Sequence, residues 1–175
     1  MIYLKAPLEK SKLYGLRAGG EILFSGKIYT ARDQAHKRIA DIVKSNKKLP
    51  LDLRGKIIYY CGPAPARKGQ VIGSCGPTTS ARMDRYTPLM LEFGVIGLIG
   101  KGRRNRGVRM AVKKHRVVYF LAPSGCGALL ASKVVSRKLA AFEDLGPEAI
   151  YELEVEDFPL IVGIDSRGKS IYEDL

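Results

Sequence analysis

The feature that most limits the fold of this chain is a regular alternation of short apolar runs with amphipathic segments. β-Branched and aromatic residues predict buried strands at Lys56–Cys61, Val95–Ile99 and Arg116–Leu121. A helical spacing of apolar residues predicts a helix at Ala31–Lys44. Strands that alternate with helices favour an α/β fold, and the chain is long enough to form a single domain, residues 1–175, with a core of its own.

The rest of the chain continues this pattern. Glu21–Thr30 is predicted to form a strand pair or one long bent strand, because Gly26 interrupts it. The segment up to Ala18 is expected to be an extended arm. Further predictions are a short strand at Val71–Ile72, helices at Thr79–Phe93, Arg103–Lys114 and Ala128–Lys138, strands at Ile150–Val155 and Leu160–Ile164, and a hairpin turn at Asp165–Gly168.

The segment Gly73–Arg85 combines residues that are suited to an anion. Its Gly-Pro pair requires a sharp turn, and Thr78 or Thr79 could cap the helix that is predicted to follow. The start of a helix directs backbone N–H groups and the positive end of its dipole toward an anion. Arg82 lies about one helical turn beyond Thr78, so a hydroxyl and a guanidinium are predicted to lie over the same point.

The sequence alone leaves two interpretations of Thr78. In the simpler one, Thr78 and Thr79 only cap a helix. In the other, Thr78 is a base, which requires a nearby cation or hydrogen-bond donors to favour its alkoxide. Arg32, Arg82 and Lys101 each fall at the edge of a predicted element, where ligands gather in an open α/β sheet. Each could be a solvated surface charge, but together they are suited to a small dicarboxylate.

A strong positive charge also needs an explanation. Thirty Lys and Arg against seventeen Asp and Glu give a formal net charge of +13. Nucleic acid, an acidic partner, anionic small molecules and a solvated basic surface are all compatible with it. The most basic run, Lys101–Arg116, lacks interleaved aromatic residues and the motifs of common nucleic-acid-binding modules. We therefore expect a solvated helix or an interface with an acidic partner there, and no nucleic-acid binding.

The cysteines and histidines do not form a recognisable ligand pattern. Cys61, Cys75 and Cys126 are widely spaced and odd in number, so they predict neither a disulfide framework nor a metal site. His36 and His115 are isolated and are expected at the surface or in packing. The sequence contains neither a long apolar run nor the pattern of a signal peptide, so we expect a cytoplasmic protein without a membrane span.

Five segments together resemble one known family. They are, in chain order, Thr30–Arg38, Tyr60–Pro65, Gly76–Asp84, Gly100–Gly102 and Glu154–Pro159. The combination extends over nearly the whole chain and is far more specific than any one segment. It resembles the β subunit, or C-terminal domain, of class I fumarate hydratase and its relative L-tartrate dehydratase.

The resemblance implies a swivelling β/β/α domain that is active only with a second, cluster-bearing α subunit in an α2β2 assembly. Such enzymes add water reversibly to fumarate to form (S)-malate, using a [4Fe–4S] cluster with one iron free of protein ligands. The cluster-binding cysteines belong to the α subunit, so no metal ligand is implied on this chain. L-Tartrate dehydratase, which forms oxaloacetate, is the alternative. A basic nucleic-acid-binding module and a subunit without catalytic residues are more distant ones.

The resemblance also implies roles for four residues. Thr78 matches the base that takes the C3 proton of malate, and Arg82 matches a ligand of a substrate carboxylate. Arg32 and Lys101 match two further substrate-binding cations. The free iron would act as a Lewis acid on the substrate hydroxyl.

Overall fold

A computed structural model describes residues 1–172 and confirms the α/β prediction. The strands are β1 (Ile2–Lys5), β2 (Glu21–Thr30), β3 (Ile57–Tyr59), β4 (Gly97–Gly100), β5 (Val118–Leu121), β6 (Val134–Ala141) and β7 (Ile150–Ile164). The α-helices are α1 (Lys10–Tyr14), α2 (Asp33–Lys44), α3 (Thr87–Glu92), α4 (Arg106–His115) and α5 (Gly127–Ser132). Two 3₁₀ helices are η1 (Ser80–Met83) and η2 (Glu143–Glu148).

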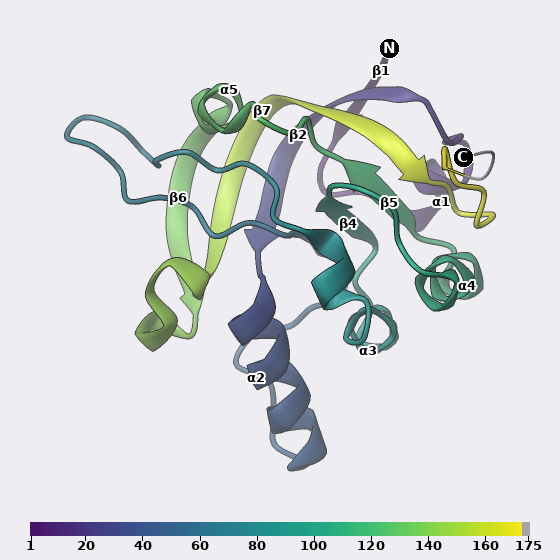
Figure 1. Cartoon of the computed structure of the whole chain (residues 1–175), viewed down its shortest axis with the longest axis horizontal. Coiled ribbons are helices and arrows are strands. Elements are labelled where there is room, and N and C mark those ends of the chain that lie inside the picture. Colours follow the sequence, from purple (N-terminus) through teal and green to yellow (C-terminus); the bar gives the residue numbers. More distant parts are fainter. Residues whose placement is uncertain (173–175) are drawn as a thin grey trace.

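Five strands close into a mixed barrel (Figure 1). β2, β3, β4 and β5 are parallel neighbours in that order. β7 runs antiparallel to both β5 and β2, which closes the ring. β1 and β6 are outer strands, paired with β2 and β7. The sheet is closed because β7, at 15 residues, is long enough to pair with both β2 and β5.

Both faces of the barrel wall are buried, which explains the nearly continuous apolar runs. Ile57 and Tyr59 of β3 belong to one apolar cluster, and Ile58 and Tyr60 belong to another. The second cluster includes side chains of α2, α3 and α4, which cover the outside of the barrel. Successive strand residues point to opposite faces, so a strand that is covered on both faces needs apolar residues at every position.

Two predicted helices are wrong in extent. The segment Thr79–Phe93 is divided between η1 and α3. Pro88 lies in the first turn of α3, where its missing N–H is tolerated, but it cannot continue a helix from the preceding turn. Within Ala128–Lys138, α5 ends at Ser132 and β6 begins at Val134, because this stretch pairs with β7.

The strand predictions also need corrections. The expected arm up to Ala18 contains β1 and α1, and Val71–Ile72 forms no strand. The segments Ile150–Val155 and Leu160–Ile164 belong to the single strand β7, since its pairing with β2 continues across the residues between them. Glu21–Thr30 is one strand with a register shift near Gly26, and the turn at Asp165–Gly168 is confirmed.

A long loop projects from the end of β3. Residues 62–76 extend away from the barrel and past β6 before the chain returns to η1 (Figure 1). The parallel strands β2, β3 and β4 all end at the edge from which this loop leaves. None of the helices within residues 1–172 has the length and apolar character needed to cross a bilayer.

Candidate functional site

The predicted site residues gather at the carboxyl edge of the barrel. Arg32 lies just beyond the end of β2, and Lys101 directly follows β4. Thr78 reaches the same edge because its backbone N–H donates to the carbonyl of Tyr60, just beyond β3, at 2.8 Å. Carboxyl ends of parallel strands are the usual ligand-binding edge of α/β folds, and the closed ring keeps that property.

Arg82 holds the hydroxyl of Thr78. Its Nη2 donates to Thr78 Oγ1 at 2.7 Å, which confirms the predicted proximity of the two side chains. The predicted capping is wrong, because Thr79 precedes η1 without a side-chain cap hydrogen bond and the next α-helix, α3, begins only at Thr87. A 3₁₀ helix of four residues has a small dipole, so the positive potential at Thr78 comes from the guanidinium.

Asp33 joins the two arginines of the site. Nε and Nη2 of Arg82 donate to its two carboxylate oxygens at 3.0 and 3.2 Å, and Nε of Arg32 donates at 3.3 Å. Partial burial raises the pKa of Asp33, but the charge of Arg82 and hydrogen bonds from both arginines outweigh this effect, so the pKa is lowered overall. Asp33 is thus ionised at neutral pH and fixes the spacing of the guanidinium groups.

Arg32 is held from three sides at the N-cap position of α2. In addition to Asp33, Glu148 lies 3.3 Å from its Nε and also accepts the N–H of Gln34 at 2.7 Å. A Cβ on Gly62 would lie 2.8 Å from Arg32 Cδ, so the Arg32 side chain packs directly against the backbone of Gly62. Thr30 precedes α2 but does not cap it, because its buried hydroxyl accepts a backbone N–H of β7 at 3.0 Å.

His36 forms a hydrogen bond with the backbone at the start of α2. It is fully buried against the rings of Tyr60 and Tyr86, and its Nδ1 lies 2.8 Å from the carbonyl oxygen of Arg32. Burial lowers the pKa of His36 to about 4, so the ring is neutral at pH 7. Because a carbonyl can only accept, Nδ1 carries the proton and donates it. The expected packing role of His36 is confirmed.

Lys101 is anchored beside Thr78 through its backbone. It forms a parallel bridge with Thr79, and its N–H donates to Ser80 Oγ at 2.8 Å. A Cβ on Gly100 would lie 2.0 Å from that oxygen, so glycine is needed for this close approach. Within residues 1–172 the ammonium group of Lys101 forms no hydrogen bond or ion pair, which leaves it available to an anion.

The described residues do not form a metal or cluster site. No group of three or more His, Cys, Asp or Glu within residues 1–172 could hold a metal ion. Burial raises the pKa of Cys75 to about 12 and also raises that of Cys61, so both remain thiols at neutral pH. Cys126 is half-buried at the start of α5. This donor set does not fit an iron–sulfur cluster.

Sequence reasoning missed the carboxylates that organise the site. Asp33 is adjacent to Arg32 in the sequence, and that proximity was a usable signal. Glu148 lies far along the chain, in η2, and no local pattern connects it with α2.

Sequence reasoning also missed a buried ion pair behind the site, since the run Lys101–Arg116 is expected to form a solvated helix or an interface with an acidic partner. The side chain of Arg104 is fully buried, and its Nε and Nη2 donate to Asp84 and to Thr87, with Tyr60 and Tyr119 on its faces.

Comparison with known proteins gives a consistent result. A family model described as the fumarase C-terminus matches residues 1–175. The chain is 42% identical to "Putative L(+)-tartrate dehydratase subunit beta" of Methanocaldococcus jannaschii, over all of this chain and 93% of that protein. It is 36% identical to "Fumarate hydratase 2" of Leishmania major over 97% of this chain, and 35% identical to "Fumarate hydratase class I, anaerobic" of Escherichia coli over 86%. These matches span 30% and 28% of the two fumarate hydratases, so the chain corresponds to less than a third of each.

Proposed function

Since the chain belongs to the family of fumarase C-terminal domains, which includes β subunits of the class I fumarate hydratase and tartrate dehydratase type, we propose that it is the β subunit of a hydro-lyase that interconverts fumarate and (S)-malate. The observation that carries the proposal is the group formed by Thr78, Arg82, Arg32 and Lys101 at one edge of the barrel. The swivelling β/β/α character of the domain and its cytoplasmic location belong to the same proposal.

The described residues of this chain supply no cluster ligands, so the proposal assigns the [4Fe–4S] cluster to an α subunit in an α2β2 assembly. That cluster would supply Lewis-acid chemistry from the partner's side of the site. The steps assigned to this chain concern only binding, orientation and proton transfer.

The cations of the site are suited to a substrate with two carboxylates. Asp33 engages Nε of Arg32 and one edge of Arg82, which leaves the Nη groups of Arg32 and Nη1 of Arg82 for a ligand. A guanidinium binds a carboxylate through parallel hydrogen bonds, and its fixed planar geometry defines the direction of approach. Lys101 adds a point charge beside Thr79. We infer that these groups hold the dianion with its C3 hydrogen toward Thr78.

Thr78 would then transfer the proton. In the dehydration direction, the deprotonated Oγ1 accepts the proton from C3 of malate. The electron pair of the C3–H bond forms the double bond of fumarate, and the C2–O bond breaks to release hydroxide. In hydration the same group returns the proton to C3. The hydrogen bond from Arg82 to Oγ1 at 2.7 Å stabilises an alkoxide more than a neutral hydroxyl, which lowers the free energy of deprotonation.

The test is reconstitution of the two-subunit enzyme. The chain is co-expressed with the cluster-bearing α subunit of the same organism, the cluster is restored without oxygen, and hydration of fumarate is followed. We expect activity that needs both chains and is lost in Thr78→Ala. Thr79→Ala is the matched control, since Thr79 is exposed and its hydroxyl forms no cap hydrogen bond. Full activity of Thr78→Ala in an assembled complex would contradict the role of Thr78.

L-Tartrate is a second candidate substrate. It is favoured by one observation, the 42% identity to the tartrate dehydratase subunit over nearly the full length of both chains. Assays of the same complex with L-tartrate and fumarate side by side distinguish the two. A higher kcat/KM for L-tartrate would mean that L-tartrate, and not fumarate, is the substrate, while the proposed binding of a dianion would stand.

A further inference from the structure

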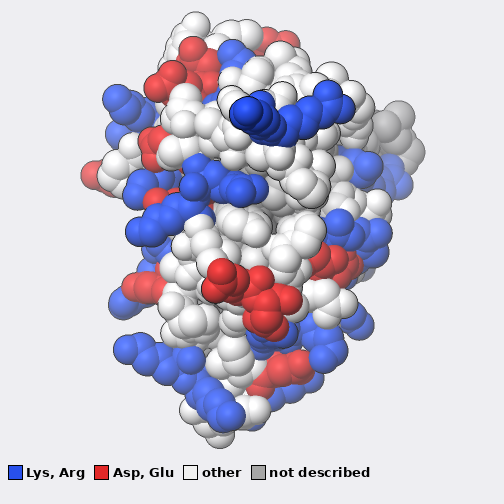
Figure 2. Space-filling model, turned by 90° about the vertical axis from the view of Figure 1, so that its left-hand side faces the viewer, with Lys and Arg blue, Asp and Glu red and all other residues white. Residues whose placement is uncertain are grey.

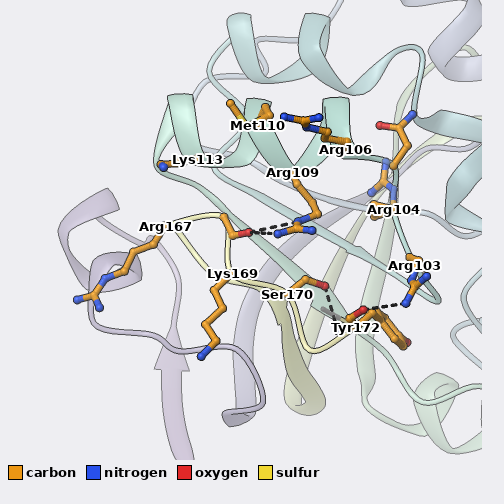
Figure 3. Close-up of a pocket in the computed structure, with 12 residues that line it drawn as sticks. Arg103, Arg104, Arg106, Arg109, Met110, Lys113, Arg167, Lys169, Ser170 and Tyr172 are labelled. Atoms are coloured by element: carbon orange, nitrogen blue, oxygen red, sulfur yellow. Dashed lines mark hydrogen bonds between the residues drawn. The ribbon is translucent and has the colours of Figure 1, made fainter. Parts of the chain in front are cut away.

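A cavity of about 750 Å³ away from Thr78 carries a high density of positive charge. It lies between α4 and the turn that follows β7 (Figure 3). Seven Lys and Arg line it, and no Asp or Glu is among its lining residues within the described part of the chain. None of the four proposed substrate-site residues lines this cavity. We call it the basic pocket.

The walls of the basic pocket are held in place by the fold. Arg109 on α4 donates from Nε and Nη2 to the carbonyl of Gly168 at 3.4 and 3.3 Å, which attaches the turn to the helix. A Cβ on Gly168 would lie 3.1 Å from Cβ of Lys113, so the two walls are in close contact there. Asp165 accepts the backbone N–H groups of Arg167 and Lys169 at 3.0 and 3.1 Å and fixes the turn.

Four of the lining cations are exposed, and no acidic residue of the described part of the chain pairs with them. Arg106 and Lys113 project from α4, and Arg167 and Lys169 belong to the turn. None of the four forms an ion pair within residues 1–172. Like charges that line one cavity repel each other, and an anion bound among them reduces that repulsion.

The distribution of charge elsewhere is different. The face shown in Figure 2, which carries β6 and the projecting loop, has Lys and Arg mixed with Asp and Glu. The positive charge on that face therefore meets opposite charges close by, whereas no Asp or Glu of residues 1–172 lines the basic pocket. A generally solvated basic surface would not separate the charges in this way.

We propose that the basic pocket binds a small, multiply charged phosphate compound. Arginine and lysine are the side chains that bind phosphate oxygens best, and the volume lies within the range of pockets for small ligands. Single-stranded nucleic acid is less suited, because its sites combine charge with several aromatic stacking platforms. Tyr172 is the one aromatic residue among the described lining residues.

The test is calorimetric titration of the full chain with sodium tripolyphosphate at fixed ionic strength. We expect one site per chain, with affinity that falls at least about tenfold in the double variant Arg106→Gln/Lys169→Gln. The control variant Lys47→Gln/Lys48→Gln removes the same charge from exposed residues outside the pocket. It should bind tripolyphosphate within about twofold of the unaltered chain.

An equal loss of affinity in both double variants would overturn the proposal, and so would equal binding of tripolyphosphate and orthophosphate. A third contradicting result would be binding of single-stranded oligonucleotides that strengthens with their length and exceeds the binding of tripolyphosphate. All four substituted side chains are exposed, so circular dichroism should show folded variants. None of these outcomes depends on the proposed hydro-lyase activity.

Discussion

The site edge and the basic pocket are both rich in cations but use them in different ways. At the site edge, Arg32 and Arg82 are tied to Asp33, and Arg32 also contacts Glu148. In the basic pocket, Arg106 and Lys169 are exposed and form no ion pair within residues 1–172. The first arrangement fixes the direction of each guanidinium, and the second sums the charge of side chains, such as these two, that no described carboxylate holds.

The comparison separates two kinds of recognition. Tethered guanidinium groups select for the geometry of a ligand, because their hydrogen bonds point in set directions. Exposed cations that no carboxylate holds bind a ligand mainly according to its total charge, and salt screens this attraction more strongly. We therefore expect the site edge to discriminate between dicarboxylates of different shape and the basic pocket to discriminate by charge.

The largest predicted effect concerns the buried pair Arg104–Asp84, which lies between the two regions. Asp84 follows Arg82 by two residues, and Arg104 is one of the residues that line the basic pocket. Asp84→Asn leaves a buried guanidinium without its counter-charge, so we expect a loss of about 3 to 5 kcal/mol of unfolding free energy. Urea denaturation followed by circular dichroism measures it. A loss below about 1 kcal/mol would mean that Tyr60 and Tyr119 suffice to stabilise the charge.

The second prediction breaks the tethered arrangement directly. Arg82→Gln removes the donor to Thr78 Oγ1 and both bonds to Asp33. In the reconstituted complex, kcat/KM should fall by roughly 10² to 10³. Arg82→Lys keeps the charge but not the fork of donors, and should recover only a minor part of that loss. Full recovery by lysine would show that charge alone matters at this edge, as proposed for the basic pocket.

The third prediction uses the pH dependence of stability. His36 has a pKa of about 4 in the folded chain, below the usual value near 6.5. Between these values the unfolded chain binds a proton that the folded chain does not, so stability present above about pH 6.5 is lost as the pH falls toward 4. The loss should approach about 3 kcal/mol. His36→Phe keeps the ring packing, and its unfolding free energy should fall less over this range. Parallel curves for the two proteins would contradict the assignment.

The fourth prediction weakens the contacts of Asp33 with Arg32 and Arg82 without removing a cation. Asp33→Asn removes the charge that holds both guanidinium groups, and kcat/KM should fall roughly 10- to 100-fold through misplacement of the two side chains. Asp41→Asn is the control, because Asp41 pairs with Lys37 on an exposed part of the same helix. Equal activity of the two variants would show that the arginines need no carboxylate to hold them.

The smallest effect is expected in the basic pocket. Arg106→Gln/Lys169→Gln removes exposed charges that form no ion pair within residues 1–172, so the unfolding free energy should change by less than about 0.5 kcal/mol. Relief of repulsion should make the change stabilising at low salt, and added salt should remove the difference. Thermal melts at low and high ionic strength test this. A marked destabilisation would mean that these residues hold the fold together.

The sequence predicts the site edge better than the barrel that carries it. Thr78 and Arg82 belong to one short segment, and a spacing of four residues brings them together in a tight turn as it would in an α-helix. Arg32 and Lys101 lie where strands end, and strand ends can be recognised from composition. Barrel closure depends instead on β7 pairing with both β2 and β5, which are distant in sequence, so no local pattern encodes it.

The same limit applies to partners that come from far along the chain. Glu148 joins α2 only because η2 packs against the start of that helix. The basic pocket forms because the turn that contains Arg167 and Lys169 lies against α4; sequence analysis predicts the helix and the turn separately but not their proximity. In both cases the residue types are visible in the sequence, but their proximity is a product of tertiary packing.

The central claim is that Thr78 transfers the C3 proton while the arginines bind and orient the substrate. Exchange of the C3 hydrogen of (S)-malate with solvent deuterium, followed by NMR in the reconstituted complex, tests it most directly. Thr78→Ala should lose exchange by roughly 10³ or more while malate still binds, and Thr79→Ala should exchange at the rate of the unaltered enzyme. Exchange in Thr78→Ala within about threefold of the unaltered enzyme would contradict the account and assign the proton to another group.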